Sequence, residues 1–242
     1  MHTVKHAIIM AAGKGERLAP VTHDTPKPLV KVNGVRMIDT IIDGLYANGI
    51  NDIHIVTGYM MERFSELHEK YPGIHLISNQ FYTEYNNISS LYVAKDILSQ
   101  GECMILDGDL VISNNKILHA DFERSGYSAI WTEQGTDEWL MQVNDEGIVT
   151  SCSREGGEKG WILFSISRWS AEDAYKLRKY LEYEFDHAGN RHLYWDDVPM
   201  FRHLDKFRLG ITPMDRGDVM EIDSYDELVK VDPSYVDYKP FN

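Results

Sequence analysis

Only two cysteines occur in the 242 residues, Cys103 and Cys152, and they lie far apart. They form no Cys-x-x-Cys pair, so we expect neither a disulfide framework nor a cysteine-based zinc site. The ten histidines show no His-Glu-x-x-His spacing or comparable metal-binding pattern. The sequence therefore has no signature of a disulfide-stabilised protein or of a zinc enzyme.

Long apolar runs and linker segments are also missing. No stretch approaches the roughly 20 apolar residues that a membrane helix requires, and residues 1–6 lead into a short apolar strand rather than a signal peptide. We therefore expect a cytoplasmic protein with no membrane partner. Because no repeat, low-complexity segment or Pro/Gly/Ser-rich linker occurs, residues 1–242 are predicted to form a single domain.

Positive charge is scarce, since 24 Lys and Arg residues face 38 Asp and Glu residues and the net charge is −14. This charge argues against nucleic acid or anionic lipid as a partner, because phosphates demand a basic surface. The first 36 residues are the exception, with two acids and six basic residues: Lys5, Lys14, Arg17, Lys27, Lys31 and Arg36. A basic segment in an acidic protein indicates a local anion-binding site.

Apolar residues make up 43% of the chain and follow a strand–helix alternation in its first half. Continuous apolar runs predict buried strands, and a 3.6-residue apolar period predicts helices between them. The expected strands are 7–10, 53–57, 74–78 and 103–106, and the expected helices are 37–48, 60–71 and 89–98. This alternation predicts a layered α/β fold with a mainly parallel sheet.

The second half is expected to be more antiparallel, because its short apolar runs are separated by Gly, Asp and Asn turns. The predicted strands are 129–132, 140–143, 148–152 and 207–211, and the predicted helices are 171–187 and 225–231.

A glycine loop, Ala11-Ala12-Gly13-Lys14-Gly15-Glu16-Arg17-Leu18, follows the first of these strands. Backbone N–H groups in such a loop can bind phosphate oxygens. The loop is not a Walker A motif, and it lacks the third glycine of the dinucleotide fingerprint, which weakens a dehydrogenase interpretation. A solvated turn is the alternative for an isolated Gly-x-Gly. We favour anion binding because Lys27 follows closely, held between Pro26 and Pro28.

The segments Ala11–Pro20 and Thr25–Leu29 together resemble the opening of the nucleotidyltransferase family that activates sugar phosphates and phospho-alcohols. The resemblance extends from about Ala7 to Leu228. It implies a three-layer, Rossmann-like α/β fold with a mixed, mainly parallel sheet, of the nucleotide-diphospho-sugar transferase type. It also implies that Ala11, Ala12, Gly13 and Gly15 wrap the triphosphate, and that the catalytic cations are Lys27, Lys14 and Arg17.

Two acidic segments are candidate metal ligands. Asp107 and Asp109 lie at the carboxyl end of a predicted strand, where open α/β sheets bind ligands. Glu221 and Asp223 would share one face of a strand near the C-terminus. The resemblance implies a Mg²⁺ cofactor with Asp109 and Asp223 as its ligands, and Glu221 is a further candidate ligand. The alternatives are exposed strand-end acids and, for Asp223, an N-cap of the last helix.

The nucleotide-binding candidates beyond the loop are Asn79, Asn87, Ser90 and Asp107. Asn79 and the segment 85–92 resemble the bacterial choline-phosphate cytidylyltransferases, in which this region lines the base and ribose. The alternative is that Asn87 and its neighbours only cap a helix.

The acceptor-binding candidates are Trp139, Tyr194 and Asp196, because the segments 136–140 and 192–197 resemble the same branch. Aromatic faces beside acids suit a quaternary ammonium. We expect these residues in a small acceptor-binding lid formed mainly by residues 130–205. The segment Arg154–Lys159 matches no motif.

These observations predict an Mg²⁺-dependent cytidylyltransferase that joins CMP from CTP to choline phosphate, giving CDP-choline and pyrophosphate. Two alternatives stay open: a transferase acting on a sugar 1-phosphate or 2-aminoethylphosphonate, and a non-catalytic nucleotide-binding module. The sequence predicts no oligomeric state.

Overall fold

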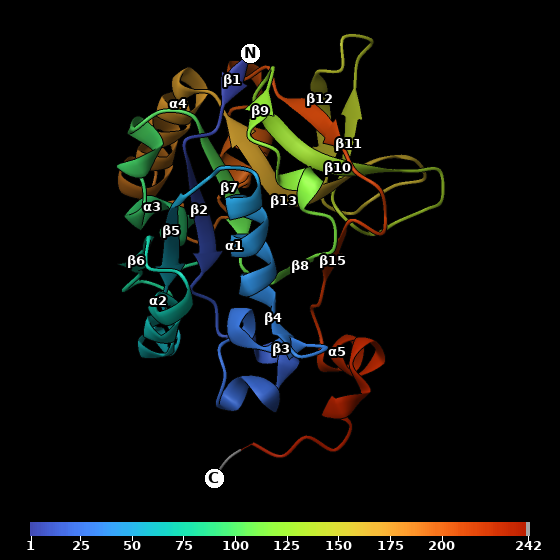
Figure 1. The fold of residues 1–242 in the computed structure, drawn as a ribbon. Helices are drawn as coiled ribbons and strands as arrows, with labels where there is room; N and C mark the ends of the chain where they lie inside the picture. The colour runs from blue at the N-terminus through green and yellow to red at the C-terminus, as the bar shows by residue number, and fades with distance from the viewer. Residues whose placement is uncertain (241–242) are drawn as a thin grey trace.

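The computed structural model describes residues 1–240, which fold around a mixed sheet of nine strands (Figure 1). The strand order is β12-β11-β13-β7-β2-β5-β6, with β10 paired to β13 and β14 paired to β10. The bounds are β2 His6–Ala11, β5 Asp52–Thr57, β6 Ile74–Ser78, β7 Cys103–Asp107, β10 Gly126–Thr132, β11 Leu140–Val143, β12 Val149–Ser153, β13 Gly160–Trp169 and β14 Gly210–Pro213.

The parallel half of the sheet is centred on β2, which is buried along its whole length. It pairs in parallel with β5 and β7, and β5 pairs in parallel with β6. The alternating side chains of β2 enter two different hydrophobic cores: Ile9 packs with the first core and Ile8 with the second. Full burial of such a side chain contributes roughly 1.5–3 kcal/mol.

Helices cover both faces of the sheet and give three layers. Helix α1 (Met37–Ala47) supplies Ile38, Ile41, Ile42 and Leu45 to the first core. Helices α3 (Ile88–Val93) and α4 (Ala171–Glu182) supply Leu91, Leu177 and Leu181 to the second. The short helix α2 (Leu67–Lys70) joins the first core through Leu67. The predicted three-layer α/β fold with a mixed, mainly parallel sheet is therefore confirmed.

The last helix, α5 (Tyr225–Val231), packs away from the sheet against the N-terminal segment. Ile222 and Leu228 share a third hydrophobic cluster with Leu18, Val30 and Met37. Figure 1 shows α5 beside the β3–β4 hairpin (Lys31–Val32 and Val35–Arg36). The C-terminal segment is thus held next to the glycine loop.

Two short strand pairs complete the structure. β8 (Leu110–Ile112) pairs antiparallel with β15 (Val219–Glu221), and β1 (His2–Thr3) pairs antiparallel with β9 (Asp121–Phe122). The β8–β15 pair matters most for function, because it joins the acidic end of β7 to the acidic C-terminal segment.

Several predicted elements differ from the structure. The helix expected at 60–71 is a 3₁₀ helix, Met61–Glu66, followed by the single turn of α2, and α3 ends at Val93 rather than near residue 98. The strand expected at 207–211 begins only at Gly210. The helix expected at 171–187 is α4 continued by a π-helix, Tyr183–His187.

Strand β13 was not predicted, although its ten residues connect the two halves of the sheet. It contains Arg168, whose side chain is buried and donates to the His119 carbonyl and to Ser128 Oγ. Charged residues are rarely buried, so this position obscures a core strand. Because β11, β12 and β13 belong to the central sheet, most of the strands in 130–205 are part of the main body. A lid function for that segment stays a prediction.

No helix within residues 1–240 combines the length and the apolar character that crossing a membrane would require.

Candidate active site

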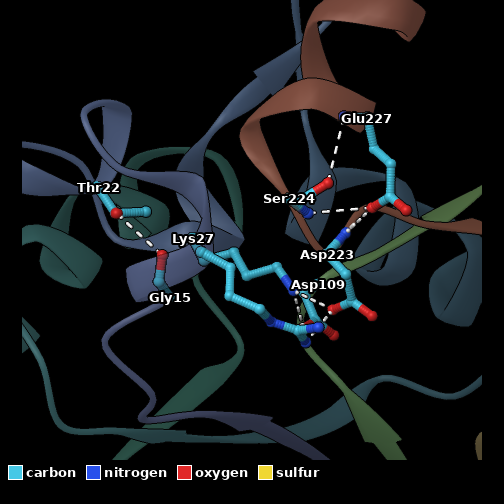
Figure 2. A network of polar contacts seen from close by, with 8 residues as sticks. Gly15, Thr22, Lys27, Asp109, Asp223, Ser224 and Glu227 are labelled. Carbon is cyan, nitrogen blue, oxygen red and sulfur yellow. Dashed lines mark hydrogen bonds and ion pairs between the residues drawn. The ribbon is translucent and has the colours of Figure 1, made fainter.

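The glycine loop follows β2 and packs directly against Lys27. Gly15 has a φ of 63°, and a Cβ at this position would lie 2.8 Å from the Lys27 Cβ. The Thr22 hydroxyl donates to the Gly15 carbonyl at 2.9 Å, as Figure 2 shows. Glycine is therefore required at position 15 by both its backbone conformation and its contact with Lys27.

Lys27 is held rigidly by the backbone on either side of it. Leu29 N–H donates to the Pro26 carbonyl at 2.8 Å and Val30 N–H to the Lys27 carbonyl at 3.1 Å, which forms a 3₁₀ turn over Lys27–Leu29. Only 10% of the Lys27 side chain is exposed. Its Nζ donates to Asp109 Oδ2 at 2.6 Å and to Asp223 Oδ1 at 3.0 Å (Figure 2).

Lys27 carries a positive charge in this environment. Burial alone would lower its pKa, but the ion pairs with Asp109 and Asp223 outweigh burial and raise the pKa above the usual range. A buried, fixed ammonium group at the end of a glycine loop can stabilise negative charge on phosphate oxygens.

Three carboxylates from two distant segments meet beside Lys27. Asp109 follows β7, and the β8–β15 pairing places Glu221 opposite Leu110. Oxygen atoms of Asp109, Glu221 and Asp223 lie within 4.8 Å of one another. The structure thus brings together all three predicted metal ligands, although residues 109 and 223 are more than a hundred positions apart.

The donor set fits a hard divalent cation. Asp109 Oδ1 is buried and has no hydrogen-bond partner among residues 1–240, and leaving such an atom unpaired is unfavourable. Glu221 is exposed as a residue, yet desolvation of its carboxyl group and the charges of Asp109 and Asp223 raise its pKa to about 8. Carboxylate oxygens are the protein ligands that Mg²⁺ prefers, and a cation would relieve this repulsion. Mg²⁺ and its ligand assignment stay predictions.

Asp223 is not the N-cap of α5, so that alternative is wrong. Ser224 caps the helix: its Oγ accepts from Glu227 N–H at 3.3 Å, and the Glu227 carboxylate accepts from Ser224 N–H at 3.0 Å. The same carboxylate accepts from Asp223 N–H at 2.8 Å. The capping box therefore leaves the Asp223 side chain free to pair with Lys27 and with Arg17, whose guanidinium lies 2.8 Å from Asp223 Oδ1.

A cavity of about 530 Å³ opens between the glycine loop and the acids. This volume is within the usual range for a small-molecule site. The lining residues include Ala11, Gly13, Lys14, Gly15, Arg17, Lys27, Tyr82, Thr83, Asp109 and Asp223. All three predicted catalytic cations therefore face one cavity; the Arg17 side chain is 71% exposed there, and Lys14 lies 3.7 Å from Glu16.

Tyr82 and Thr83 were missed by the sequence analysis. The sequence feature that could have indicated them is Gly58, which directly follows β5. A Cβ at this position would lie 2.8 Å from the Tyr82 ring. A glycine directly after a strand can indicate close approach of another segment.

Five predicted nucleotide-binding residues, Ala12, Asn79, Asn87, Ser90 and Asp107, are not among the lining residues of this cavity in the described chain. Asn79 is buried and donates to Ser89 Oγ and Ser90 Oγ, both at 3.0 Å. Asn87 Oδ1 accepts from Trp195 N–H at 2.8 Å and makes no capping bond to α3. In this structure, these amides fasten α3 to its neighbours; their contact with a nucleotide stays a prediction.

Asp107 and Asp196 are two further acidic residues whose pKa values are raised. Burial, followed by the charges of Asp109 and Asp196, raises the pKa of Asp107 well above its usual range. Asp196 is buried and accepts from the Tyr127 hydroxyl at 2.8 Å. Burial, with a further contribution from Asp197, raises the pKa of Asp196 to about 7 even though the Tyr127 hydrogen bond opposes the shift.

Trp139 and Tyr194 do come together, with ring centroids 5.9 Å apart in an edge-to-face contact. Phe201, which the sequence analysis missed, makes a second edge-to-face contact with Trp139 at 5.3 Å. The space beside these rings holds a side chain of the protein itself, the guanidinium of Arg154, which pairs with Asp197. Arg154 lies in the segment for which the sequence offered no motif.

Several known proteins are similar to this chain in sequence. The Nucleotidyl transferase family profile matches residues 6–134. A 2-aminoethylphosphonate cytidylyltransferase from Lancefieldella rimae is 39% identical over 231 residues, covering 96% of this chain and 93% of that protein. A choline-phosphate cytidylyltransferase from Streptococcus pneumoniae is 35% identical over 226 residues, covering 93% of this chain and 96% of that protein.

A solved cytidylyltransferase structure also resembles this chain over most of its length. CTP:phosphocholine cytidylyltransferase from Streptococcus pneumoniae superposes with a TM-score of 0.87 at 33% identity, covering 97% of this chain and 100% of that chain. Both the sequence match and the structural match extend over nearly the whole molecule, and the predicted resemblance is therefore confirmed. The chain belongs to the nucleotidyltransferase family, close to the bacterial cytidylyltransferases.

Proposed function

We propose that this protein transfers CMP from CTP to a small acceptor that carries a phosphonate or phosphate at one end and a primary ammonium at the other, with 2-aminoethylphosphonate as the leading candidate. The observation that carries the proposal is the position of Lys27, whose ammonium lies between Asp109 and Asp223 at the edge of the glycine-loop cavity. Two relatives named as cytidylyltransferases, and the solved CTP:phosphocholine cytidylyltransferase, support the choice of nucleotide.

The reaction requires positioning and charge neutralisation more than proton transfer. An acceptor phosphate is already largely dianionic near pH 7, so no general base is needed. One acceptor oxygen attacks the α-phosphorus of CTP, the bond between the α-phosphorus and its bridging oxygen to the β-phosphorus breaks, and pyrophosphate leaves. Mg²⁺ held by Asp109 and Asp223 would neutralise charge on the phosphates. Lys27 orients and stabilises the α-phosphate, while Lys14 and Arg17 contact the departing pyrophosphate.

A second cavity beside the first suits the ammonium end of the acceptor. It measures about 430 Å³ and is lined by acids that include Asp137, Glu138, Glu221, Asp223 and Glu227. Asp223 lines both cavities, so a molecule in the second cavity lies next to the metal ligands. A primary ammonium donates three hydrogen bonds and matches such a wall of acceptors.

Choline phosphate, the acceptor that the sequence analysis predicted, is the second candidate. Trp139 and Tyr194 supply aromatic faces of the kind that recognise a trimethylammonium group. We place it second because the Arg154 guanidinium already lies against the Trp139 ring.

The test is pyrophosphate release by the purified protein with Mg²⁺ and each of the four NTPs. Each NTP is paired in turn with 2-aminoethylphosphonate, ethanolamine phosphate, choline phosphate and glucose 1-phosphate. We expect release with CTP and the primary-ammonium acceptors, and slower release with choline phosphate. A preference for glucose 1-phosphate would contradict the proposed acceptor, and release of no pyrophosphate with any pair would support the non-catalytic alternative.

A further inference from the structure

The side chains of Trp139, Tyr194, Phe201 and Asp197 form what we call the aromatic cation site. Its rings meet edge to face, and its acid, Asp197, is nearly fully buried, with 3% of the side chain exposed. Asp197 Oδ2 accepts from Tyr194 N–H at 2.9 Å, which fixes the carboxylate beside the rings. Aromatic faces with a buried carboxylate form a binding site for a cation.

The cation in this site belongs to the protein. The guanidinium carbon of Arg154 lies 4.1 Å from the centre of the Phe201 ring and 5.5 Å from that of Trp139. The same guanidinium pairs with the Asp197 carboxylate. Arg154 thereby supplies the charge that a buried carboxylate needs, because an unpaired charge at this depth is strongly unfavourable.

Arg154 occupies the site from a turn whose backbone is well fixed. The turn follows β12, and Gly157 exchanges two backbone hydrogen bonds with Thr136, at 2.9 and 3.0 Å. Gly156 has a φ of 70°, and a Cβ there would meet the Thr136 carbonyl oxygen at 1.7 Å. The Arg154 side chain is nonetheless 46% exposed, so it can swing into solvent by rotation of its own bonds.

The aromatic cation site lies beside the acid-lined cavity. Trp139, one of its rings, directly follows Glu138, and Glu138 and Asp223 line that cavity. Asp223 also belongs to the three carboxylates whose oxygen atoms lie within 4.8 Å of one another. An acceptor whose phosphate lies at these carboxylates therefore has both the acid-lined cavity and the aromatic cation site nearby.

We propose that Arg154 determines acceptor specificity by filling the aromatic cation site with its own guanidinium, which disfavours acceptors whose cation is a quaternary ammonium. A trimethylammonium group cannot donate hydrogen bonds to the acid-lined cavity and depends on aromatic faces, so it must displace Arg154 to bind. A primary ammonium has the acid-lined cavity available and does not compete with Arg154. This inference rests on the proposed cytidylyl transfer and names the residue that selects its substrate.

The experiment compares the wild-type enzyme with Arg154→Gln, which removes the charge and keeps a polar side chain. The readout is pyrophosphate release with CTP and Mg²⁺, measured as kcat and KM for choline phosphate and for 2-aminoethylphosphonate. Arg208→Gln is the matched control, because Arg208 is 72% exposed and pairs with Glu146 outside the site. Phe201→Leu is a second variant, which loosens the guanidinium without removing its charge.

We expect Arg154→Gln to raise the ratio of kcat/KM for choline phosphate to kcat/KM for 2-aminoethylphosphonate by about tenfold or more, mainly through a lower KM for choline phosphate. The KM for CTP should not change, and Arg208→Gln should leave the ratio at its wild-type value. Phe201→Leu should shift the ratio less, since it also removes one aromatic face.

Two results would overturn the inference. An equal loss of kcat/KM with both acceptors would mean that Arg154 contacts the phosphate or phosphonate that they share, and wild-type kcat/KM with both acceptors would mean that Arg154 does not select between them. If Arg154→Gln does not fold, Arg154→Lys serves the same test, since a lysine lacks the planar group that stacks on Phe201. Failure of the wild-type enzyme with every acceptor would instead refute the proposed function.

Discussion

Replacing Asp109 by asparagine tests the acidic cluster most directly, because this substitution keeps the side-chain shape and removes one charge. Asp109 Oδ2 accepts from Lys27 at 2.6 Å, and Asp109 Oδ1 is buried without a hydrogen-bond partner in the described chain. Lys27 keeps its second ion pair, with Asp223 at 3.0 Å, so we expect the fold to survive.

The expected effect is on turnover and on the response to Mg²⁺. Removing one electrostatic contact to the transition state typically lowers kcat by about 10²–10³-fold, and we expect a loss of at least that size. In the wild-type protein, Mg²⁺ should raise the melting temperature, because a ligand that binds only the folded state stabilises it. In Asp109→Asn this increase should be much smaller.

The assay is pyrophosphate release as a function of Mg²⁺ concentration, together with calorimetric melting with and without Mg²⁺. Asp145→Asn is the control, because Asp145 is an exposed acid in the turn between β11 and β12. Near-normal turnover and a wild-type Mg²⁺ response in Asp109→Asn would refute the assignment of Asp109 as a metal ligand.

Three further predictions concern stability. Gly15→Ala should lower the free energy of unfolding by about 1–3 kcal/mol and impair turnover, because the added Cβ is strained at a positive φ and meets Lys27. Gly147→Ala is the control: its φ of 71° is similar, but a Cβ there has no atom within 4 Å, so only the backbone strain should remain. Urea unfolding and pyrophosphate release measure both variants. Burial raises the pKa of Asp196 to about 7 in the folded protein, compared with 3.8 for an unburied aspartate. Between these two pH values the folded protein holds a proton that the unfolded chain releases, so stability falls as pH rises. Asp196→Asn should remove roughly 2 kcal/mol of the decrease between pH 5 and 7 in urea unfolding, and an unaltered pH profile would contradict the shift. Ser224→Ala should lower the free energy of unfolding by about 1 kcal/mol, because it removes the N-cap of α5. Thermal melting measures this effect, and an unchanged melting temperature would mean that Ser224 does not stabilise the helix.

Local sequence patterns were enough to predict the parallel half of the fold and the position of the glycine loop. The strands 7–10, 53–57 and 103–106 were predicted because both of their faces are buried, which makes their sequences mostly apolar. Strand 74–78 was also predicted, although it lies at the edge of the sheet and only Ile74 is fully buried. The glycine loop and Lys27 were also predicted from local signals, since glycine and proline restrict or release the backbone at their own positions.

Other features depend on contacts between segments that are distant in sequence, and these contacts exist only in the folded chain. Strand β13 was hidden because buried Arg168 finds its partners in His119 and Ser128, which are remote in sequence. Asn79 and Ser90, predicted to face a nucleotide, bind each other, and no local pattern distinguishes these two uses of a polar side chain. Arg154 carries no motif at all, and only folding places its guanidinium against Phe201 and Asp197. Local sequence restricts the backbone, whereas the partner of a long polar side chain is set by whichever segments the fold brings beside it.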